Sequence, residues 1–131
     1  MALQYTKKVM NHFMNPKFKG EIKNCDAIGK VGNPACGDIM HVFLKIDPKT
    51  EKIKDIKFQT MGCVAAIATS DALCMLAKGK TLTQAEKITG EEIIKSLGEL
   101  PSIKVHCSVL GERALKKAIE NYKFSKTRSK R

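Results

Sequence analysis

The chain has 131 residues, enough for one domain with a substantial core, and its 24 lysines and arginines against 13 acids give a net charge of +11. A basic chain suits an acidic partner, but five Phe, two Tyr and no Trp offer little for base stacking, so nucleic acid is disfavoured as the main partner. No apolar run is long enough to span a bilayer, and the first residues, MALQYTKKVM, are too polar for an export signal. The sequence therefore predicts a cytoplasmic protein without a membrane partner.

The N-terminal region predicts one helix and then a long loop. Tyr5, Val9 and Phe13 recur every four residues, and Pro16 ends the pattern, which is typical of a short amphipathic helix. His12 lies at the edge of this apolar stripe and is interpreted as a structural histidine. Residues 17–37 are rich in Gly, Asn, Lys and Pro and predict a loop with at most one short strand around 27–31.

A β-hairpin is predicted next. Residues 39–46 and 53–58 are rich in β-branched and aromatic residues, and the polar turn DPKTEK joins them. The spacing of Ile53, Ile56 and Phe58 breaks strict alternation and leaves the register of the second strand open.

A helix rich in small apolar residues follows the hairpin. Gly62 ends the strand, Cys63 stands at the junction, and residues 64–78 form the helix. Cys74 is expected to be a buried, inert thiol inside it. The large residues expected to fill the core from this helix are Ile67, Leu73, Met75 and Leu76.

Capping boxes indicate two more short helices. Thr83 with Glu86 opens one, and Thr89 with Glu92 opens another that Gly98 closes.

A long amphipathic helix and a basic tail complete the chain. Leu110, Ala114, Ala118 and Tyr122 run down one helix face at four-residue intervals. The stretch 123–131 carries five basic residues and no acid. The sequence therefore predicts a domain over 1–124 and a disordered basic tail over 125–131.

Three of the five cysteines stand where elements meet. Cys36 precedes a strand in the segment NPACGDIM, Cys63 joins a strand to a helix, and Cys107 joins a loop to the last helix. A reducing compartment and an odd count make thiols or metal ligands more plausible than disulfides. A helix N-terminus stabilises a thiolate through its unpaired N–H groups and its dipole.

These cysteines and two neighbouring donors form the candidate site. Asp38 adds an oxygen and His106 adds a nitrogen, so that the set is Cys36, Asp38, Cys63, His106 and Cys107. The gaps of 27 and 44 residues match no compact zinc or ferredoxin motif, whose ligands come in close pairs. From spacing alone, ordinary buried cysteines and a metal site remain equally open.

Three separated motifs resemble one family. The segments NPACGD, GCVAAIATS and LPSIKVHC, with the opening YTKKVMNHFMNPKFKG and the ending ERALKKAIENYK, resemble the IscU/NifU-type iron–sulfur cluster assembly scaffolds. The resemblance implies an α+β fold in which about four to five helices pack on a small three-stranded antiparallel sheet, with the cysteine site at one end. It also implies a scaffold, not an enzyme, on which iron and sulfur are built into a labile cluster, usually [2Fe–2S], for transfer to apo-proteins.

The resemblance carries over to the candidate residues one by one. Cys36, Cys63 and Cys107 match the family's essential cysteines, Asp38 its cluster-tuning aspartate and His106 the histidine beside the last cysteine. Three soft thiolates with one harder donor leave one weakly held coordination position, and this position allows the cluster to be released. The same ligands suit iron or tetrahedral zinc.

The implied partners are a cysteine desulfurase of the IscS/NifS type and recipient apo-proteins, and a homodimer is compatible with the sequence. Residues 100–104 read Leu-Pro-Ser-Ile-Lys where the bacterial scaffolds have Leu-Pro-Pro-Val-Lys, which argues against delivery to a dedicated Hsp70-type chaperone. The alternative function is a zinc-dependent sulfurtransferase that accepts persulfide sulfur and stimulates a desulfurase.

Overall fold

The computed structural model describes residues 5–33 and 38–129 and contains one sheet with helices around it. The elements in chain order are α1 (Lys7–Met14), β1 (Ala27–Asn33), β2 (Asp38–Ile46), β3 (Ile53–Met61), α2 (Val64–Ala77), α3 (Leu82–Ala85), α4 (Gly90–Ser96), the 3₁₀ turn η1 (Ser102–Lys104) and α5 (His106–Ser129). The α+β fold with a small three-stranded antiparallel sheet is confirmed.

The sheet is a meander in the order β1-β2-β3, which fixes what lies at each of its ends. Asn33 pairs with Asp38, and Ile39 pairs with Met61. β1 therefore ends, β2 begins and β3 ends at the same end of the sheet, which we call the site end. Ala27, at the start of β1, pairs with Leu44 toward the opposite end.

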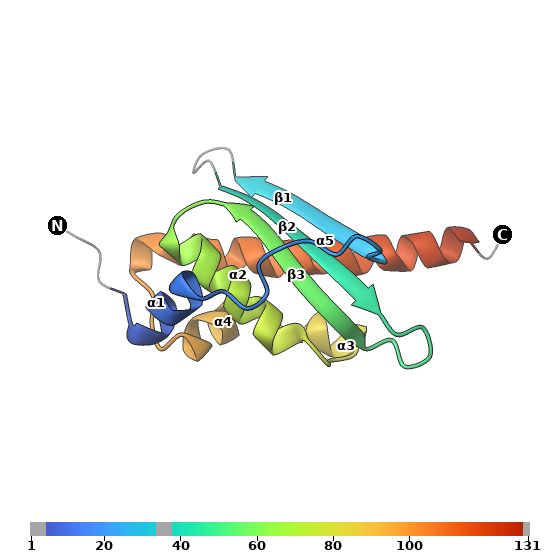
Figure 1. Ribbon diagram of the computed structural model, residues 1–131, viewed down its shortest axis with the longest axis horizontal. Helices are drawn as coiled ribbons and strands as arrows, with labels where there is room; N and C mark the ends of the chain where they lie inside the picture. The colour runs from blue at the N-terminus through green and yellow to red at the C-terminus, as the bar shows by residue number, and fades with distance from the viewer. Residues whose placement is uncertain (1–4, 34–37, 130–131) are drawn as a thin grey trace.

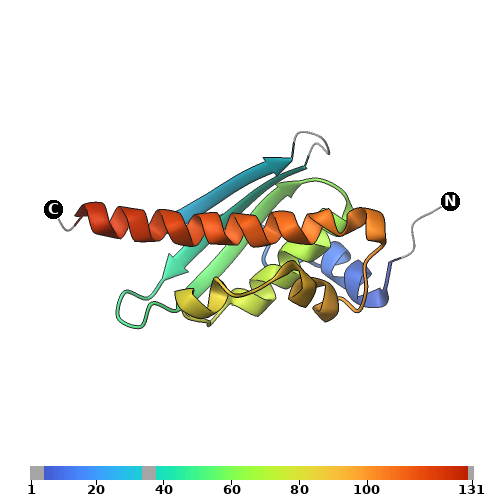
Figure 2. The same ribbon diagram turned by 180° about the vertical axis from the view of Figure 1, so that it is seen from behind.

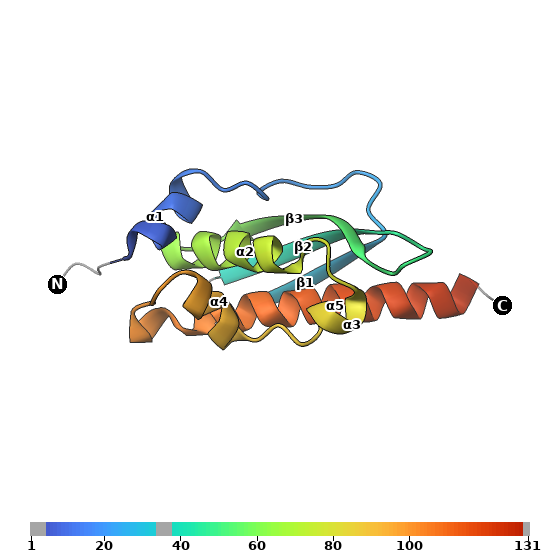
Figure 3. The ribbon, with the colours of Figure 1, turned by 90° about the horizontal axis from the view of Figure 1, so that it is seen from below.

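The layers follow from this topology (Figure 1). Helix α5 crosses one face of the sheet and continues past it at its C-terminal end, as Figure 2 shows from behind. Figure 3 shows residues 15–26 on the other side of the sheet from α5. Two backbone hydrogen bonds fasten this connection to the edge of β3, from Gly20 N–H to the carbonyl oxygen of Phe58 and from Phe58 N–H to that of Phe18.

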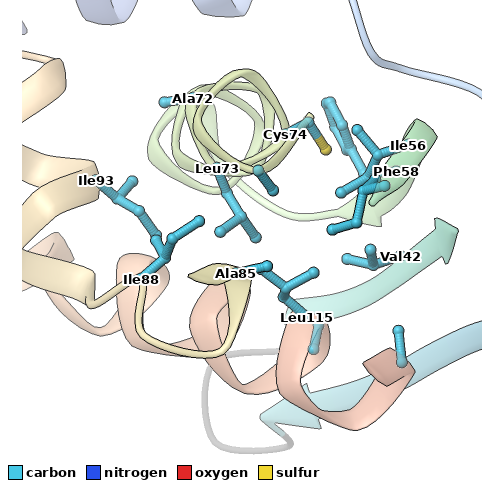
Figure 4. Packing of buried hydrophobic residues seen from close by; sticks show 14 of the residues in the cluster. Val42, Ile56, Phe58, Ala72, Leu73, Cys74, Ala85, Ile88, Ile93 and Leu115 are labelled. Atoms are coloured by element: carbon cyan, nitrogen blue, oxygen red, sulfur yellow. The ribbon is translucent and has the colours of Figure 1, made fainter. Parts of the chain in front are cut away.

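The core fills the space between the sheet and the helices. Every second residue of β2 from Met40 to Ile46 is buried, as an antiparallel strand with one covered face requires. Figure 4 shows Cys74 of α2 beside Ile56 and Phe58 of β3, with Leu73 of the same helix nearer Ala85 and Ile88. None of the helices in the described part of the chain combines the length and the apolar composition that crossing a membrane requires.

A bulge explains the irregular spacing in the second hairpin strand. Ile46 pairs with Ile53 and Lys45 pairs with Asp55, so one extra residue stands in β3 at this point. Ile53 and Ile56, three positions apart, can therefore both face the core. The bulge resolves the register that the sequence left open.

The two short helices are present, but one cap was predicted wrongly. Thr89 is the N-cap of α4, and its hydroxyl accepts a hydrogen bond from Glu92 N–H, as predicted. Helix α3 begins two residues earlier than predicted, because Thr81 is its N-cap and forms the capping box with Gln84. Thr83 lies inside that helix.

Two further predictions need correction. The sequence predicts Met75 in the core, but its side chain is 47% exposed and lies beside Asn11 and Phe18 at a hollow between α1 and α2. Residues 125–129, predicted to be disordered, continue α5. Adding a residue to an existing helix costs little free energy compared with starting a helix. A polar segment can therefore stay helical beyond the last residue that packs against the core. Residues 130–131 lie outside the described chain.

Helix α5 approaches β1 so closely that Gly29 leaves no space for a side chain. A Cβ at this position would lie 2.1 Å from the carbonyl oxygen of Ala114 and 2.5 Å from the amide nitrogen of Ala118. We expect Gly29→Ala to lower the free energy of unfolding by about 2–3 kcal/mol because the helix must move away. Urea denaturation measures this, with Lys30→Ala as the control at an exposed position of the same strand. Equal midpoints for the two variants would contradict the close approach.

Candidate functional site

Two of the predicted site cysteines stand at helix N-termini on the site end of the sheet. Cys63 follows the last residues of β3 and is the N-cap of α2, with extended backbone and no capping hydrogen bond from its own side chain. Cys107 is the second residue of α5, directly after the η1 turn. The strand-to-helix and loop-to-helix junctions predicted for these cysteines are confirmed.

The fold brings these two thiols together although 44 residues separate them. The Sγ atoms of Cys63 and Cys107 are 4.0 Å apart. The Nε2 atom of His106 lies 3.7 Å from Cys107 Sγ. Two soft sulfur donors and one imidazole nitrogen therefore share one location, a donor set that suits zinc and iron–sulfur chemistry.

Small side chains make this approach of two helices possible. Ala65 and Ala66, in the first turn of α2, form a buried cluster with Cys107, and Tyr5 and Leu100 pack against it. Cys107 is 1% exposed, whereas Cys63 is half-buried. The two thiols thus differ in access from solvent.

Two neighbours of the thiols were not identified from the sequence. Lys104 donates a hydrogen bond to Cys63, and the negative charge of that thiolate raises the pKa of Lys104. The pKa of Tyr5 is raised first by burial and then by the Cys63 thiolate, while Lys104 opposes the shift. In the sequence, Lys104 stands in the segment LPSIK and Tyr5 in an apolar stripe, and neither pattern indicates a contact with a thiol. No sequence signal links residues this far apart.

The remaining predicted ligands are described only in part. Cys36 lies outside the described residues, and β2 begins at Asp38, of whose side chain the structure gives no description. Among the residues that the structure does describe, no three His, Cys, Asp or Glu side chains are grouped to hold a metal ion. The structure shows that Cys63 and Cys107 lie together. The convergence of Cys36 with them stays a prediction.

The other two cysteines lie elsewhere. Cys25 precedes β1, and that strand runs for seven residues, about 20 Å, to reach the site end. Cys74 lies in α2 eleven residues after Cys63, about 16 Å along the helix, and is fully buried in the main core. The candidate set from the sequence contains neither Cys25 nor Cys74, and their positions in the fold are consistent with that.

Burial gives Cys74 a testable chemical property. Its pKa is raised well above the ordinary thiol value, chiefly by burial and next by the charge of Asp71. Because the thiolate is the reactive form, we expect Cys74 to be alkylated at least about tenfold more slowly than Cys25 at pH 8. Peptide mapping after a short iodoacetamide pulse measures both rates in one sample. Equal rates would show that this part of the core opens readily.

His12 takes part in a buried pair away from the cysteines. Its Nδ1 atom is 2.6 Å from Oδ2 of Asp71, and Oδ1 of Asp71 accepts a hydrogen bond from Phe18 N–H at 2.9 Å. Asp71 is 1% exposed, and the pair fastens α1 and the chain after it to α2. The structural interpretation of His12 is consistent with this contact.

Comparisons with known proteins agree with the architecture and with the family that the sequence motifs resemble. Residues 4–129 match the family model described as NifU-like N terminal domain. The iron–sulfur cluster assembly scaffold protein IscU 1 of Archaeoglobus fulgidus is 50% identical over 118 residues, covering 90% of this chain and 76% of that protein. IscU of Buchnera aphidicola subsp. Schizaphis graminum is 43% identical over 130 residues, covering 97% of this chain and 100% of that protein.

A solved structure supports the same fold. It belongs to a protein of Fervidobacterium islandicum AW-1 described as a candidate iron–sulfur cluster assembly scaffold for the SUF system. It superposes with a TM-score of 0.73 at 24% identity, and the match covers 88% of this chain and 96% of that one.

Proposed function

Because the chain belongs to the NifU-like N-terminal domain family, we propose that it is a scaffold on which an iron–sulfur cluster is assembled and then passed to apo-proteins. The observation that carries the proposal is the 4.0 Å separation of the Cys63 and Cys107 sulfurs at two helix N-termini. Two thiols held this close are suited to ligating one small cluster.

The third cysteine is proposed to complete the sulfur ligands. The connection 34–37, which contains Cys36, joins β1 to β2 at the site end, where β3 also ends and leads to Cys63. In the sequence, Cys36 stands between Asn33 and Asp38, the pair with which β1 ends and β2 begins. We propose Cys36, Cys63 and Cys107 as the thiolate ligands, with Asp38 or His106 as the exchangeable fourth donor.

The cargo of this scaffold is proposed to be a [2Fe–2S] cluster. Sulfur comes from a cysteine desulfurase of the IscS/NifS type, iron is added, and recipient apo-proteins take the product. The chain acts as a carrier and not as a turnover catalyst. Its proposed compartment is the cytoplasm, and a homodimer is one proposed form of the protein. Zinc is proposed as an alternative occupant, since two thiolates and an imidazole also suit tetrahedral zinc.

Reconstitution distinguishes this proposal from a zinc-dependent sulfurtransferase. The chain is incubated anaerobically with ferrous iron, cysteine and an IscS-type desulfurase, and visible absorption is followed. A scaffold develops the absorption of a [2Fe–2S] cluster, in proportion to protein, and retains it through gel filtration. A protein that stays colourless while it accelerates desulfurase turnover would contradict the proposal.

The basic end of the chain is expected to be dispensable for cluster formation. Residue 125 lies about 27 Å along α5 from Cys107. We expect truncation after Phe124 to leave the cluster yield unchanged but to weaken binding of the desulfurase, most clearly at low salt, because four positive charges are lost.

A full-length variant in which Lys126, Arg128, Lys130 and Arg131 are replaced by glutamine is the matched control. It should reproduce the weaker binding if charge is responsible. A large fall in cluster yield on truncation would show that this segment supports the site.

A further inference from the structure

The face of the sheet that points away from α5 carries a hollow next to the site end, which we call the outer hollow. Lys19 and Gly20 line it from the connection 15–26, and Ile39, Thr60 and Met61 line it from the strands, around a volume of about 490 Å³. Figure 3 shows this connection running along the sheet on the side opposite α5. The outer hollow therefore lies between the connection and strands β2 and β3.

The strand register places the outer hollow beside the cysteine site. Ile39 pairs with Met61 where β2 begins and β3 ends, and Met61 stands two residues before Cys63. None of the described residues that line the hollow is a proposed ligand. A segment bound there would therefore lie next to the site without using the ligands themselves.

Two neighbouring apolar side chains of the outer hollow are exposed. Ile39 is 44% exposed and Met61 is 70% exposed, and they pair across β2 and β3. Single exposed apolar side chains are common on proteins, whereas neighbours that line one hollow favour a binding surface. Methionine also adapts its unbranched side chain to partners of different shape. The outer hollow thus offers an apolar anchor point.

The charges around the outer hollow are mainly positive. Lys19 lines it, and the exposed Lys30 pairs with His41 across β1 and β2. Lys57 extends from the same face of β3, and its Nζ atom donates a hydrogen bond of 3.5 Å to the connection. No described lining residue is acidic, and residues 17–23 of the connection hold three lysines and one glutamate. A negatively charged segment therefore complements this surface.

Thr60 presents main-chain groups at the same edge of β3. The N–H and C=O groups of Phe58 pair with the connection through Phe18 and Gly20, so they point away from β2. Backbone groups of every second residue in an antiparallel strand point to the same edge, and those of Thr60 therefore do so as well. In residues 5–33 and 38–129, no backbone group pairs with Thr60 at that edge. An extended segment can bind there as an added strand.

We propose that the outer hollow binds an extended segment of a partner protein in which acidic and apolar residues alternate. The apolar side chains contact Ile39 and Met61, the carboxylates lie beside Lys19 and its neighbouring lysines, and the main chain pairs with Thr60. Charge complementarity favours an acidic partner over a second copy of this chain, whose net charge is +11. This binding goes beyond the proposed function, because it requires no cluster, and it holds the partner beside the cysteine site.

The probe is a capped peptide of sequence Glu-Val-Glu-Leu-Glu-Val-Glu, added to the ¹⁵N-labelled full chain under reducing conditions in physiological salt. Amide chemical shifts report both the affinity and the position of binding. One control peptide has lysine in place of every glutamate, and a second has serine in place of valine and leucine. A third is methylated on the amide nitrogens of valine and leucine, which removes the donors that an added strand needs.

The probe is expected to produce saturable shifts centred on the amides of Gly20, Thr60 and Met61. Lys19→Glu and Met61→Asp should each weaken its binding at least about fivefold, because the first removes a charge partner and the second an apolar anchor. Each control peptide should also bind at least about fivefold more weakly than the probe.

The chain provides matched control variants for both substitutions. Lys49→Glu changes an exposed lysine in the hairpin turn at the opposite end of the sheet, and Met14→Asp changes a methionine that is 66% exposed on α1. Both should leave the affinity for the probe unchanged. Amide shifts that stay unchanged away from the substituted residue verify that each variant folds.

An absence of saturable shifts would overturn the proposal. Equal weakening by Lys19→Glu and Lys49→Glu, or equal binding of the serine-containing peptide, would overturn it in favour of diffuse attraction to a basic chain. Shifts of the same amides that depend on the concentration of the chain, and that the probe does not reverse, would assign the outer hollow to a second copy. The measurement uses the chain without iron or sulfide, so none of these outcomes decides whether the chain assembles a cluster.

Discussion

Cys107→Ser is expected to reduce the yield of assembled cluster at least about tenfold, because it removes a buried thiol that we propose as a ligand. Among the described residues, no other thiol near Cys63 can substitute for it. Serine has nearly the same size, and its hydroxyl is a poor ligand for iron in place of a thiolate. The fold should therefore survive while the absorption of the reconstituted protein is lost. Visible absorption after anaerobic reconstitution, normalised to folded protein, measures the effect.

The chain offers matched controls for the site cysteines. Cys74 is as buried as Cys107 but lies in the main core, so Cys74→Ala tests whether loss of any buried thiol lowers the yield. Cys25 is half-buried like Cys63 and serves as its control. A Cys107→Ser chain that assembles cluster as well as the Cys74→Ala chain would remove Cys107 from the ligand set.

Asp38→Ala is expected to lengthen the lifetime of the bound cluster several-fold in air. If Asp38 is the weak fourth donor or admits water to the cluster, its loss removes the easiest exit for iron. We expect the substitution to cost the fold less than about 1 kcal/mol. Decay of visible absorbance, compared with wild type at equal initial cluster content, gives the lifetime.

Asp47→Ala is the control for a carboxylate in a turn at the opposite end of the sheet, where Asp47 accepts a hydrogen bond from Lys49 N–H. Its cluster should decay like that of the wild type. If Asp38 only shapes its turn, alanine loosens the loop and the cluster decays faster. The two roles of Asp38 therefore predict changes of opposite sign.

Sequence patterns predicted a helix or strand correctly where a single local signal, such as apolar spacing or a glycine, was present. The four-residue spacing predicted α1 and α5, and Gly62 marked the change from β3 to α2 with Cys63 at its N-cap. Where two local rules competed, the prediction failed. Thr81 and Thr83 each begin a plausible capping box, and packing of Leu82 and Ala85 into the core selects Thr81.

Features that depend on tertiary contact could not be predicted. The bulge between Lys45 and Ile46 places Ile53 and Ile56 on one face, and strand alternation alone cannot reveal it. Lys104 and Tyr5 reach the thiols only because η1 and α1 are held beside the start of α2. Asp71 became interpretable only when the fold placed His12 against it.

For the site itself, junction placement singled out Cys63 and Cys107, and the resemblance supplied their chemistry. The structure adds the 4.0 Å separation of the two sulfur atoms and the deeper burial of Cys107. Neither quantity follows from residues that are 44 positions apart in the sequence.

The most direct measurement of the scaffold function is transfer of a cluster from this chain to an apo-ferredoxin. The chain is reconstituted with desulfurase, freed of iron and sulfide by gel filtration, and mixed anaerobically with apo-ferredoxin in the presence of an iron chelator. Circular dichroism in the visible range then follows the ferredoxin spectrum as it appears. A scaffold predicts conversion of most of the apo-ferredoxin, in step with loss of cluster from this chain and despite the chelator. A chain that retains its cluster, or loses it to the chelator without forming holo-ferredoxin, would contradict the proposal.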